Sequence, residues 1–245
     1  MKADPQLQWR LLDLQTADTR LAQIAHRAKN LPEAAAVEAR TAEIATLDSE
    51  IARARVDDED VQRELTKAEN DVALVRDRAA RNRQRLDAGQ GSAKDMQALT
   101  HELQSLARRQ SELEEIELEI MERAEAATGR LTALTERRAP LDAALAEAEH
   151  ARDAAVAGLD QERTDVATRR ENIAAGVGGE LLALYEKIRA TTGMGAAPLT
   201  QRRCEGCNLE LMSADLDRIR RAAEDEVVRC DECRRILVRT AESGL

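Results

Sequence analysis

Apolar and small side chains recur at alternating steps of three and four residues along much of this chain. From residue 44 to residue 86 the spacing persists for about six heptads. A stripe of this kind becomes buried only when a second helix lies along it, so the pattern predicts a coiled coil. The predicted seam positions are Ile44, Leu47, Ile51, Ala54, Asp58, Val61, Leu65, Ala68, Val72, Val75, Ala79, Asn82 and Leu86.

The composition agrees with long helices that bury a thin seam. Aromatic residues make up 1% of the 245 residues and charged residues 34%, with no Phe, one Trp and one Tyr. A large globular core normally draws on the area of aromatic side chains, so this chain has little material for one.

The seam stops at residues 87 to 95, where the sequence reads DAGQGSAKD. Gly89 suits a helix C-terminal cap, Gly91 frees the backbone to turn, and Ser92 with Asp95 resembles a capping box. The sequence therefore predicts that one helix ends here and that a second one begins near Ala93.

Two arms of similar length, residues 5 to 87 and 93 to 174, flank this turn near 88–92. The economical interpretation is an antiparallel coiled-coil hairpin formed by a monomer, with pairing between two chains as the alternative. Pro32 predicts a kink near 30–32, and Pro140 a bend in the second arm.

The predicted seam of the second arm contains one irregular step. The step from Ile120 to Ala124 follows another step of four, which we interpret as a local change of winding. The positions are Met96, Leu99, Leu103, Leu106, Gln110, Leu113, Ile116, Ile120, Ala124, Ala127, Leu131, Leu134, Arg138, Leu141, Leu145 and Ala148.

All four cysteines lie near the end of the chain as two Cys-x-x-Cys pairs. Cys204 and Cys207 are separated from Cys230 and Cys233 by 22 residues. Two tight turns of this kind can aim four sulfurs at one zinc ion and leave no open position for substrate. We therefore predict one structural Zn²⁺, with two disulfides, a redox pair and an iron–sulfur cluster as the alternatives.

These features divide the chain into three predicted parts. Residues 1–175 form the helical hairpin, 176–198 a short helix followed by a flexible linker, and 199–245 a zinc-ribbon domain with a few short strands. In the ribbon we expect a strand at NLEL, a helix capped by Ser213, and a closing strand at RILVR. The residue after each second cysteine requires a left-handed backbone, which suits Asn208 better than Arg234.

The chain resembles a bacterial family of coiled-coil hairpins that end in a C4-type zinc ribbon, in particular its actinobacterial branch. The likeness rests on KDMQALTHELQSLARRQSELEEIELEIMER (94–123) and on CEGC with VVRCDECRRILVRTAESGL. It implies a non-enzymatic protein whose structural zinc is held by the four cysteines. Members in other bacteria look like adaptors that contact a sigma factor, export components or RNA.

The residues themselves also argue against an enzyme. His26, His101 and His150 lie far apart within the helical arms, and no nucleophile or carboxylate pair stands out. We therefore expect a protein-binding adaptor or scaffold, and the resemblance implies that it serves transcription or RNA metabolism. The segment LLALYEKIRA can dock a partner helix or pack against the N-terminal helix.

Nucleic-acid binding through the ribbon is the alternative function. Arginines flank the cysteine pairs, and they are candidate contacts to nucleic acid or to a partner. However, residues 199–245 contain nine Arg and ten acidic residues, and the whole chain carries a net charge of -10. The candidate contacts are Arg202, Arg203, Arg229, Arg234, Arg235 and Arg239.

A third hypothesis is a regulator that enters the RNA polymerase secondary channel with the hairpin tip, where Asp87 and Asp95 flank the turn. Acidic residues at helix ends are also ordinary capping groups. No stretch approaches the roughly 18 apolar residues of a membrane span. We expect a cytoplasmic protein that does not contact membranes.

Overall fold

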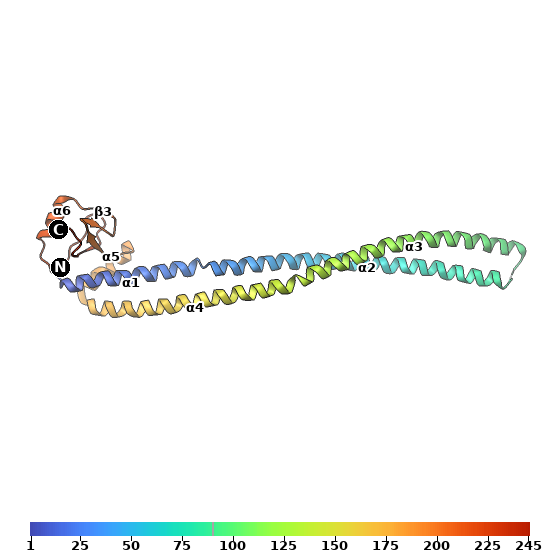
Figure 1. Ribbon diagram of the computed structural model, residues 1–245, viewed down its shortest axis with the longest axis horizontal. Helices are drawn as coiled ribbons and strands as arrows, with labels where there is room; N and C mark the ends of the chain where they lie inside the picture. Colours follow the sequence, from blue (N-terminus) through green and yellow to red (C-terminus); the bar gives the residue numbers. More distant parts are fainter. Residues whose placement is uncertain (90) are drawn as a thin grey trace. The chain divides into compact units, whose positions relative to one another are not determined.

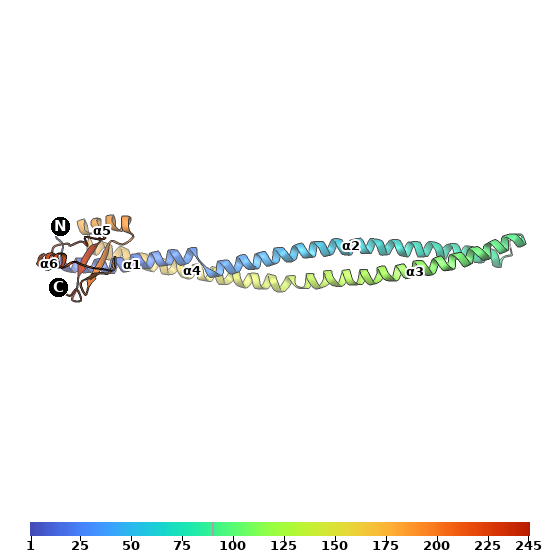
Figure 2. The same cartoon turned by 90° about the horizontal axis from the view of Figure 1, so that it is seen from above.

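The computed structural model describes residues 1–89 and 91–245. It divides into two compact units, Ala35–Glu149 and a second formed by Met1–Ala34 with His150–Leu245. The predicted fold class, mainly α with a helical hairpin and a few short C-terminal strands, is confirmed (Figures 1 and 2). The elements are α1 (Pro5–Lys29), α2 (Pro32–Asp87), α3 (Ala93–Glu136), α4 (Arg138–Val177), α5 (Gly179–Thr192), β1 (Ala196–Thr200), β2 (Arg203–Cys204), β3 (Leu209–Glu210), α6 (Ser213–Arg221) and β4 (Ile236–Arg239).

In the unit Ala35–Glu149, α2 and α3 run side by side as a coiled-coil hairpin (Figures 1 and 2). All thirteen predicted seam positions of α2 are buried or half-buried. Cross-helix contacts fix the register: Arg76 pairs with Glu114 at 2.6 Å, and the Thr128 hydroxyl donates to Asp58 at 2.6 Å. The polar side chain at seam position 58 is therefore satisfied by the opposite helix.

The predicted seam of α3 is wrong at one position. Ile116 is 45% exposed, and Glu117 is half-buried in its place. The steps from Leu113 through Glu117 and Ile120 to Ala124 are four, three and four, so the heptad continues without the predicted change of winding. Helix periodicity, maintained by the positions on either side, outweighs the hydrophobicity of one residue.

The helix ends follow the local sequence. Ser92 and Asp95 form a reciprocal capping box at the start of α3. Residue 90, which falls within the predicted turn 88–92, lies outside the described residues. The break between α3 and α4 lies at Arg137, three residues before Pro140, because that proline has no N–H to donate to the carbonyl of Glu136.

The other unit places a small sheet between two apolar clusters. The strand order is β3-β2-β1-β4, with β1 antiparallel to β2 and parallel to β4. Side chains alternate across the sheet: Ala196, Ile236 and Val238 face the helices, whereas Leu199 and Leu237 face the cysteines. The helix-side cluster also contains Leu11, Leu14, Ala174, Val177, Leu181, Tyr185 and Ile188.

This arrangement differs from the flexible linker expected up to residue 198. Strand β1 begins at Ala196, and Ala196, Ala197 and Leu199 are at most 2% exposed. The Gly, Thr and Pro content suggested a loop, but burial on both faces and pairing with β4 hold this segment as a strand. The segment LLALYEKIRA lies in α5, where Leu181, Tyr185 and Ile188 pack in the helix-side cluster, as the second interpretation expected.

The N-terminal residues are part of the same unit. The N–H of Ala3 donates to the carbonyl of Asp225 at 2.7 Å, and the N–H of Val227 donates to Met1 at 3.1 Å. The indole N–H of Trp9 donates to the carbonyl of Arg239 in β4 at 2.8 Å. Helix α1 is thereby joined to the ribbon by backbone and side-chain hydrogen bonds.

Candidate metal centre

The two cysteine pairs form matching turns. The N–H of Asn208 donates to the carbonyl of Cys204 at 2.7 Å, and the N–H of Arg234 donates to Cys230 at 2.9 Å. Asn208 has a φ of 58° and Arg234 one of 62°, so both positions require the left-handed backbone that the spacing predicts. For Arg234 this conformation costs roughly 1–2 kcal/mol, because its Cβ crowds the following carbonyl.

The four sulfur atoms lie together. They are all within 4.8 Å of one another, with Cys204 and Cys230 buried and Cys207 and Cys233 half-buried. The Sγ atoms of Cys204 and Cys233 are 3.8 Å apart, and those of Cys207 and Cys230 are 3.9 Å apart. Sulfurs at the corners of a tetrahedron around zinc are about 3.8 Å apart, whereas those of a disulfide are about 2.0 Å apart. The donor set fits zinc.

Electrostatics give the same result. Burial raises the pKa of the Cys204 thiol, as does the neighbouring Cys230, although the amides of Cys207 and Gly206 oppose this. Burial also raises the pKa of Cys230. At Cys233 burial acts in the same direction, but the amide of Arg235 and the surrounding thiols outweigh it and lower the pKa. Four thiolates at this spacing repel one another, so their ionisation requires a cation between them.

Comparison with known proteins agrees with this geometry. Residues 14–193 match the model of the CT398-like coiled coil hairpin domain, and residues 203–237 match the C4-type zinc ribbon domain. This chain belongs to the CT398-like hairpin family. Both the predicted resemblance and the predicted structural zinc ion are therefore confirmed.

Several relatives of this CT398-like protein come from mycobacteria, in agreement with an actinobacterial branch. An uncharacterized protein of Mycobacterium tuberculosis (strain H37Rv) is 41% identical over 239 residues, which is 98% of each chain. A structure from Mycobacterium smegmatis has a TM-score of 0.85 at 40% identity and covers 98% of this chain and 100% of that one. The structure of CT398 from Chlamydia trachomatis, with a TM-score of 0.66 at 17% identity over 96% and 98% of the two chains, shows the same fold.

Two of the six candidate arginines are held by several hydrogen bonds to backbone carbonyls. Arg239 donates to the carbonyls of five residues between 219 and 226, at 2.7 to 3.4 Å. Arg235 donates to the carbonyl of Gly206 and, at 3.1 Å, to that of Thr192. Both side chains are half-buried and connect the loops around the cysteines. The other four, Arg202, Arg203, Arg229 and Arg234, are exposed. Of these, Arg229 donates through Nε to the carbonyl of Arg234 at 2.8 Å.

The predicted helix within the ribbon begins as expected, but its cap differs. Ser213 is the first residue of α6, and Met212 occupies the N-cap position without a side-chain hydrogen bond. The helix is held in place instead by Leu216 and Ile219. Both are buried in the apolar cluster on the cysteine side of the sheet (the cysteine-side cluster), which also contains Leu199, Cys204, Cys230 and Leu237.

A buried ionic cluster in the helical base was not predicted. The Asp18 side chain is 2% exposed and accepts hydrogen bonds from Arg170, Arg189 and the Tyr185 hydroxyl, at 2.7, 2.7 and 2.6 Å. Glu186 pairs with both arginines, so the cluster carries no net charge. One signal was present in the sequence, because Asp18 follows Leu14 by four residues and therefore occupies a seam position.

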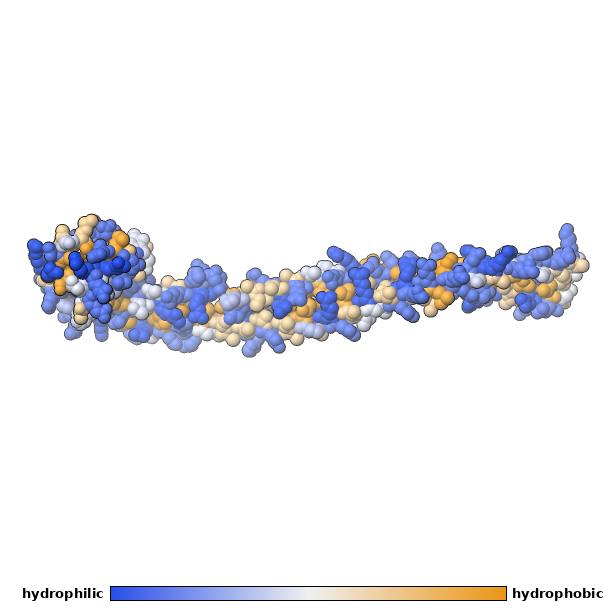
Figure 3. All heavy atoms as spheres, turned by 45° about the horizontal axis from the view of Figure 1, so that its top comes forward, coloured by the Kyte–Doolittle hydropathy of each residue, from blue (hydrophilic) through white to orange (hydrophobic). Residues whose placement is uncertain are grey.

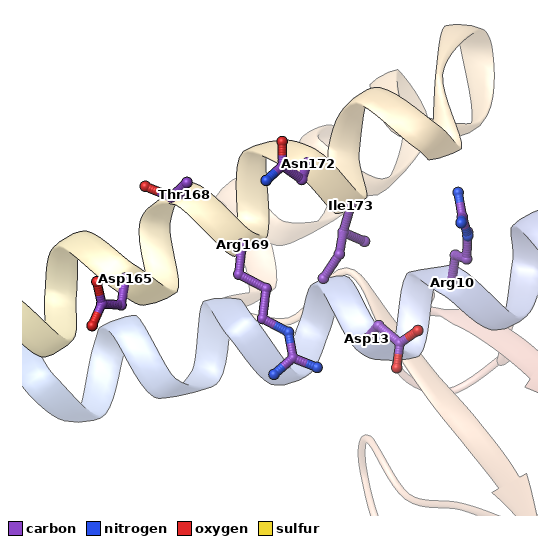
Figure 4. Close-up of a pocket in the computed structure, with 7 residues that line it drawn as sticks. All are labelled: Arg10, Asp13, Asp165, Thr168, Arg169, Asn172 and Ile173. Carbon is purple, nitrogen blue, oxygen red and sulfur yellow. The ribbon is translucent and has the colours of Figure 1, made fainter.

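A surface hollow of about 470 Å³ lies between α1 and the end of α4 (Figure 4). It is lined by Arg10 and Asp13 of α1 and by Asp165, Thr168, Arg169, Asn172 and Ile173 of α4. All of these residues except the half-buried Ile173 are exposed. The hollow therefore offers solvated charges of both signs and no enclosed space that would exclude water from a reaction.

Proposed function

We propose that this CT398-like hairpin protein is a non-enzymatic adaptor or scaffold whose structural zinc is held by Cys204, Cys207, Cys230 and Cys233. The observation that carries the proposal is the set of four sulfurs within 4.8 Å of one another. Four thiolates fill the tetrahedral positions of zinc, so the ion has no position left for a substrate or an activated water.

Side chains elsewhere support a non-catalytic role. His26, His101 and His150 are exposed on separate helices. Asp18 and Tyr185, the most buried titratable pair outside the ribbon, bond to each other and to arginines. Burial and then the Asp18 carboxylate raise the pKa of Tyr185, so its phenol stays protonated at neutral pH and does not act as a general base.

We further propose that the protein acts in the cytoplasm, as a monomeric hairpin, in transcription or RNA metabolism. The role in transcription or RNA rests on the resemblance to adaptor-type family members. The monomer is supported by α2 and α3, which cover each other's seams within one chain. Among the described helices, none is long and apolar enough to cross a membrane.

Nucleic-acid binding is the second candidate, because Arg202, Arg203, Arg229 and Arg234 are exposed on the ribbon. The ten acidic residues of positions 199–245 oppose it. A secondary-channel regulator is less well supported, since Asp95 already accepts from the N–H and the hydroxyl of Ser92, at 2.8 and 2.7 Å.

One experiment separates the two candidates. Labelled RNA and DNA are titrated across salt with the wild type, with Arg202→Gln plus Arg203→Gln, and with a control, Arg53→Gln plus Arg55→Gln, whose exposed arginines lie on α2. The same three proteins are used as bait in a native lysate. The adaptor proposal predicts a recovered protein partner and no nucleic-acid affinity that falls steeply with salt. Steep binding that only the ribbon variant loses would contradict it.

A further inference from the structure

An apolar hollow on the hairpin is a candidate surface for binding the partner of the proposed adaptor, an inference that rests on the adaptor function. The hollow, about 360 Å³, is lined by residues of both helices. Small side chains create it, since Ala124 and Thr128 lie where the opposite helix presents Leu65 and Gln62. Figure 3 shows hydrophobic atoms reaching the surface of this hairpin among hydrophilic ones.

Two large apolar side chains continue the hollow onto the surface of α3. Met121, which lines it, is 38% exposed, and Leu118, one turn earlier, is 60% exposed. Neither residue occupies a seam position, so packing between α2 and α3 does not account for them. Residues three apart lie on one face of a helix, so the two side chains form a single apolar strip.

Carboxylates border this strip. Glu115 and Glu122 lie within one turn of Leu118, and Glu125 lies one turn after Met121. Within the described residues these three carboxylates form no ion pair, whereas the nearby Glu114 is paired with Arg76. The rim of the strip is therefore acidic, and its charge is not neutralised by the hairpin itself.

We propose that this acidic groove, formed by Gln62, Leu65, Leu118, Met121, Ala124 and Glu125, binds a basic amphipathic helix of a partner protein. Apolar side chains one turn apart on that helix would enter the hollow, and its Lys or Arg residues would meet the glutamates. A second copy of this chain is disfavoured, because a two-fold contact would bring the same glutamates together. Nucleic acid and anionic lipid are repelled by the same charge.

The test uses the full chain and a labelled synthetic helix of about 16 residues, with Leu on one face and Lys on the other. A peptide with Glu in place of Lys is the control ligand. We expect the Leu/Lys peptide to bind the wild type and the Leu/Glu peptide not to bind. The double variant Leu118→Gln plus Met121→Gln should raise the Kd for the Leu/Lys peptide at least about tenfold. The double variant Glu122→Gln plus Glu125→Gln should make binding of this peptide less dependent on salt.

The matched control is Val56→Gln plus Leu74→Gln, two α2 positions that are 56% and 66% exposed and do not line the hollow. This control should leave the Kd unchanged. An equal loss of peptide affinity in the control and in Leu118→Gln plus Met121→Gln would overturn the proposal. Sedimentation of the wild type as a dimer that Leu118→Gln plus Met121→Gln dissociates would assign the groove to a second copy instead.

A lysate bait experiment distinguishes this inference from the adaptor function. If the wild type and the Leu118→Gln plus Met121→Gln variant capture the same partner equally, the adaptor function stands and the groove is not its surface. If the wild type captures no partner but binds the Leu/Lys peptide at the groove, the adaptor proposal fails and the surface remains.

Discussion

At the scale of single residues, Asp18 shows how far sequence reasoning extends. Its position between Leu14 and Leu21 places it on the buried side of α1. Its partners Arg170 and Arg189 are 152 and 171 residues away in the chain, so the fold alone brings them together. An acid at a seam position thus indicates a buried polar contact, but the sequence does not say with which residue.

Replacing Asp18 with Asn should destabilise the helical base strongly. The change removes one of the two carboxylates that balance Arg170 and Arg189, so that only Glu186 remains. Breaking a buried ion pair in this way lowers the free energy of unfolding by about 3–5 kcal/mol. Urea unfolding followed by the emission of Trp9 measures the loss. The control Asp13→Asn, at an exposed position on the same helix, should shift stability by less than about 0.5 kcal/mol. Equal effects would contradict the buried network.

Tyr185 makes a separate prediction at alkaline pH. Burial, and then the Asp18 carboxylate, raise the pKa of its phenol above the ordinary value of 10.0. Below that value the phenol is neutral in both the folded and the unfolded state, so its contribution to stability is complete. Above it the unfolded chain ionises first, so stability falls as pH rises. The difference in unfolding free energy between wild type and Tyr185→Phe should therefore shrink above about pH 10, and a constant difference would refute the buried phenol.

At the scale of elements, periodicity predicts more than the identity of single residues. All thirteen seam positions of α2 were correct, and the error at Ile116 arose from preferring an isoleucine to the adjacent Glu117. Strand β1 was missed for a different reason. Its sequence AAPLT has little β-propensity, and it is a strand because β2 and β4 pair with it and both of its faces are covered.

The corrected seam predicts a stability gain at one position and almost no change at its neighbour. Glu117→Leu should raise the unfolding free energy by about 1 kcal/mol, because an apolar group replaces a carboxylate at a half-buried seam position. Ile116→Gln should change it by less than about 0.5 kcal/mol, since Ile116 is 45% exposed. Thermal unfolding of both variants measures these effects. A large loss of stability in Ile116→Gln, with no gain in Glu117→Leu, would favour the original seam.

At the scale of the whole molecule, the ribbon sheet is shared between the zinc site and the helices. Strands β1 and β4 contribute side chains to the cysteine-side cluster and to the helix-side cluster. The ribbon is thus joined to α1 and α5 through its own sheet. The sequence indicated a zinc site and a hairpin but not this shared layer, because the mostly apolar residues of AAPLT and ILVR do not reveal what covers each face.

Removal of the metal should therefore be detected beyond the ribbon. In Cys230→Ser, loss of the site should release β4 and with it the hydrogen bond from Trp9 to Arg239, so the emission of the sole tryptophan should change. Far-ultraviolet helicity should largely remain, since α2 and α3 pack on each other. An unaltered Trp9 signal after the ribbon has unfolded would show that the two clusters are independent.

One zinc ion held by four thiolates keeps the ribbon folded. Elemental analysis of freshly purified protein, combined with titration of its thiols by a mercurial reagent, measures whether this ion is present. The structure predicts one zinc per chain, released in step with modification of Cys204, Cys207, Cys230 and Cys233. A chain that is fully folded without any bound metal, or whose cysteines are found in disulfides, would contradict it.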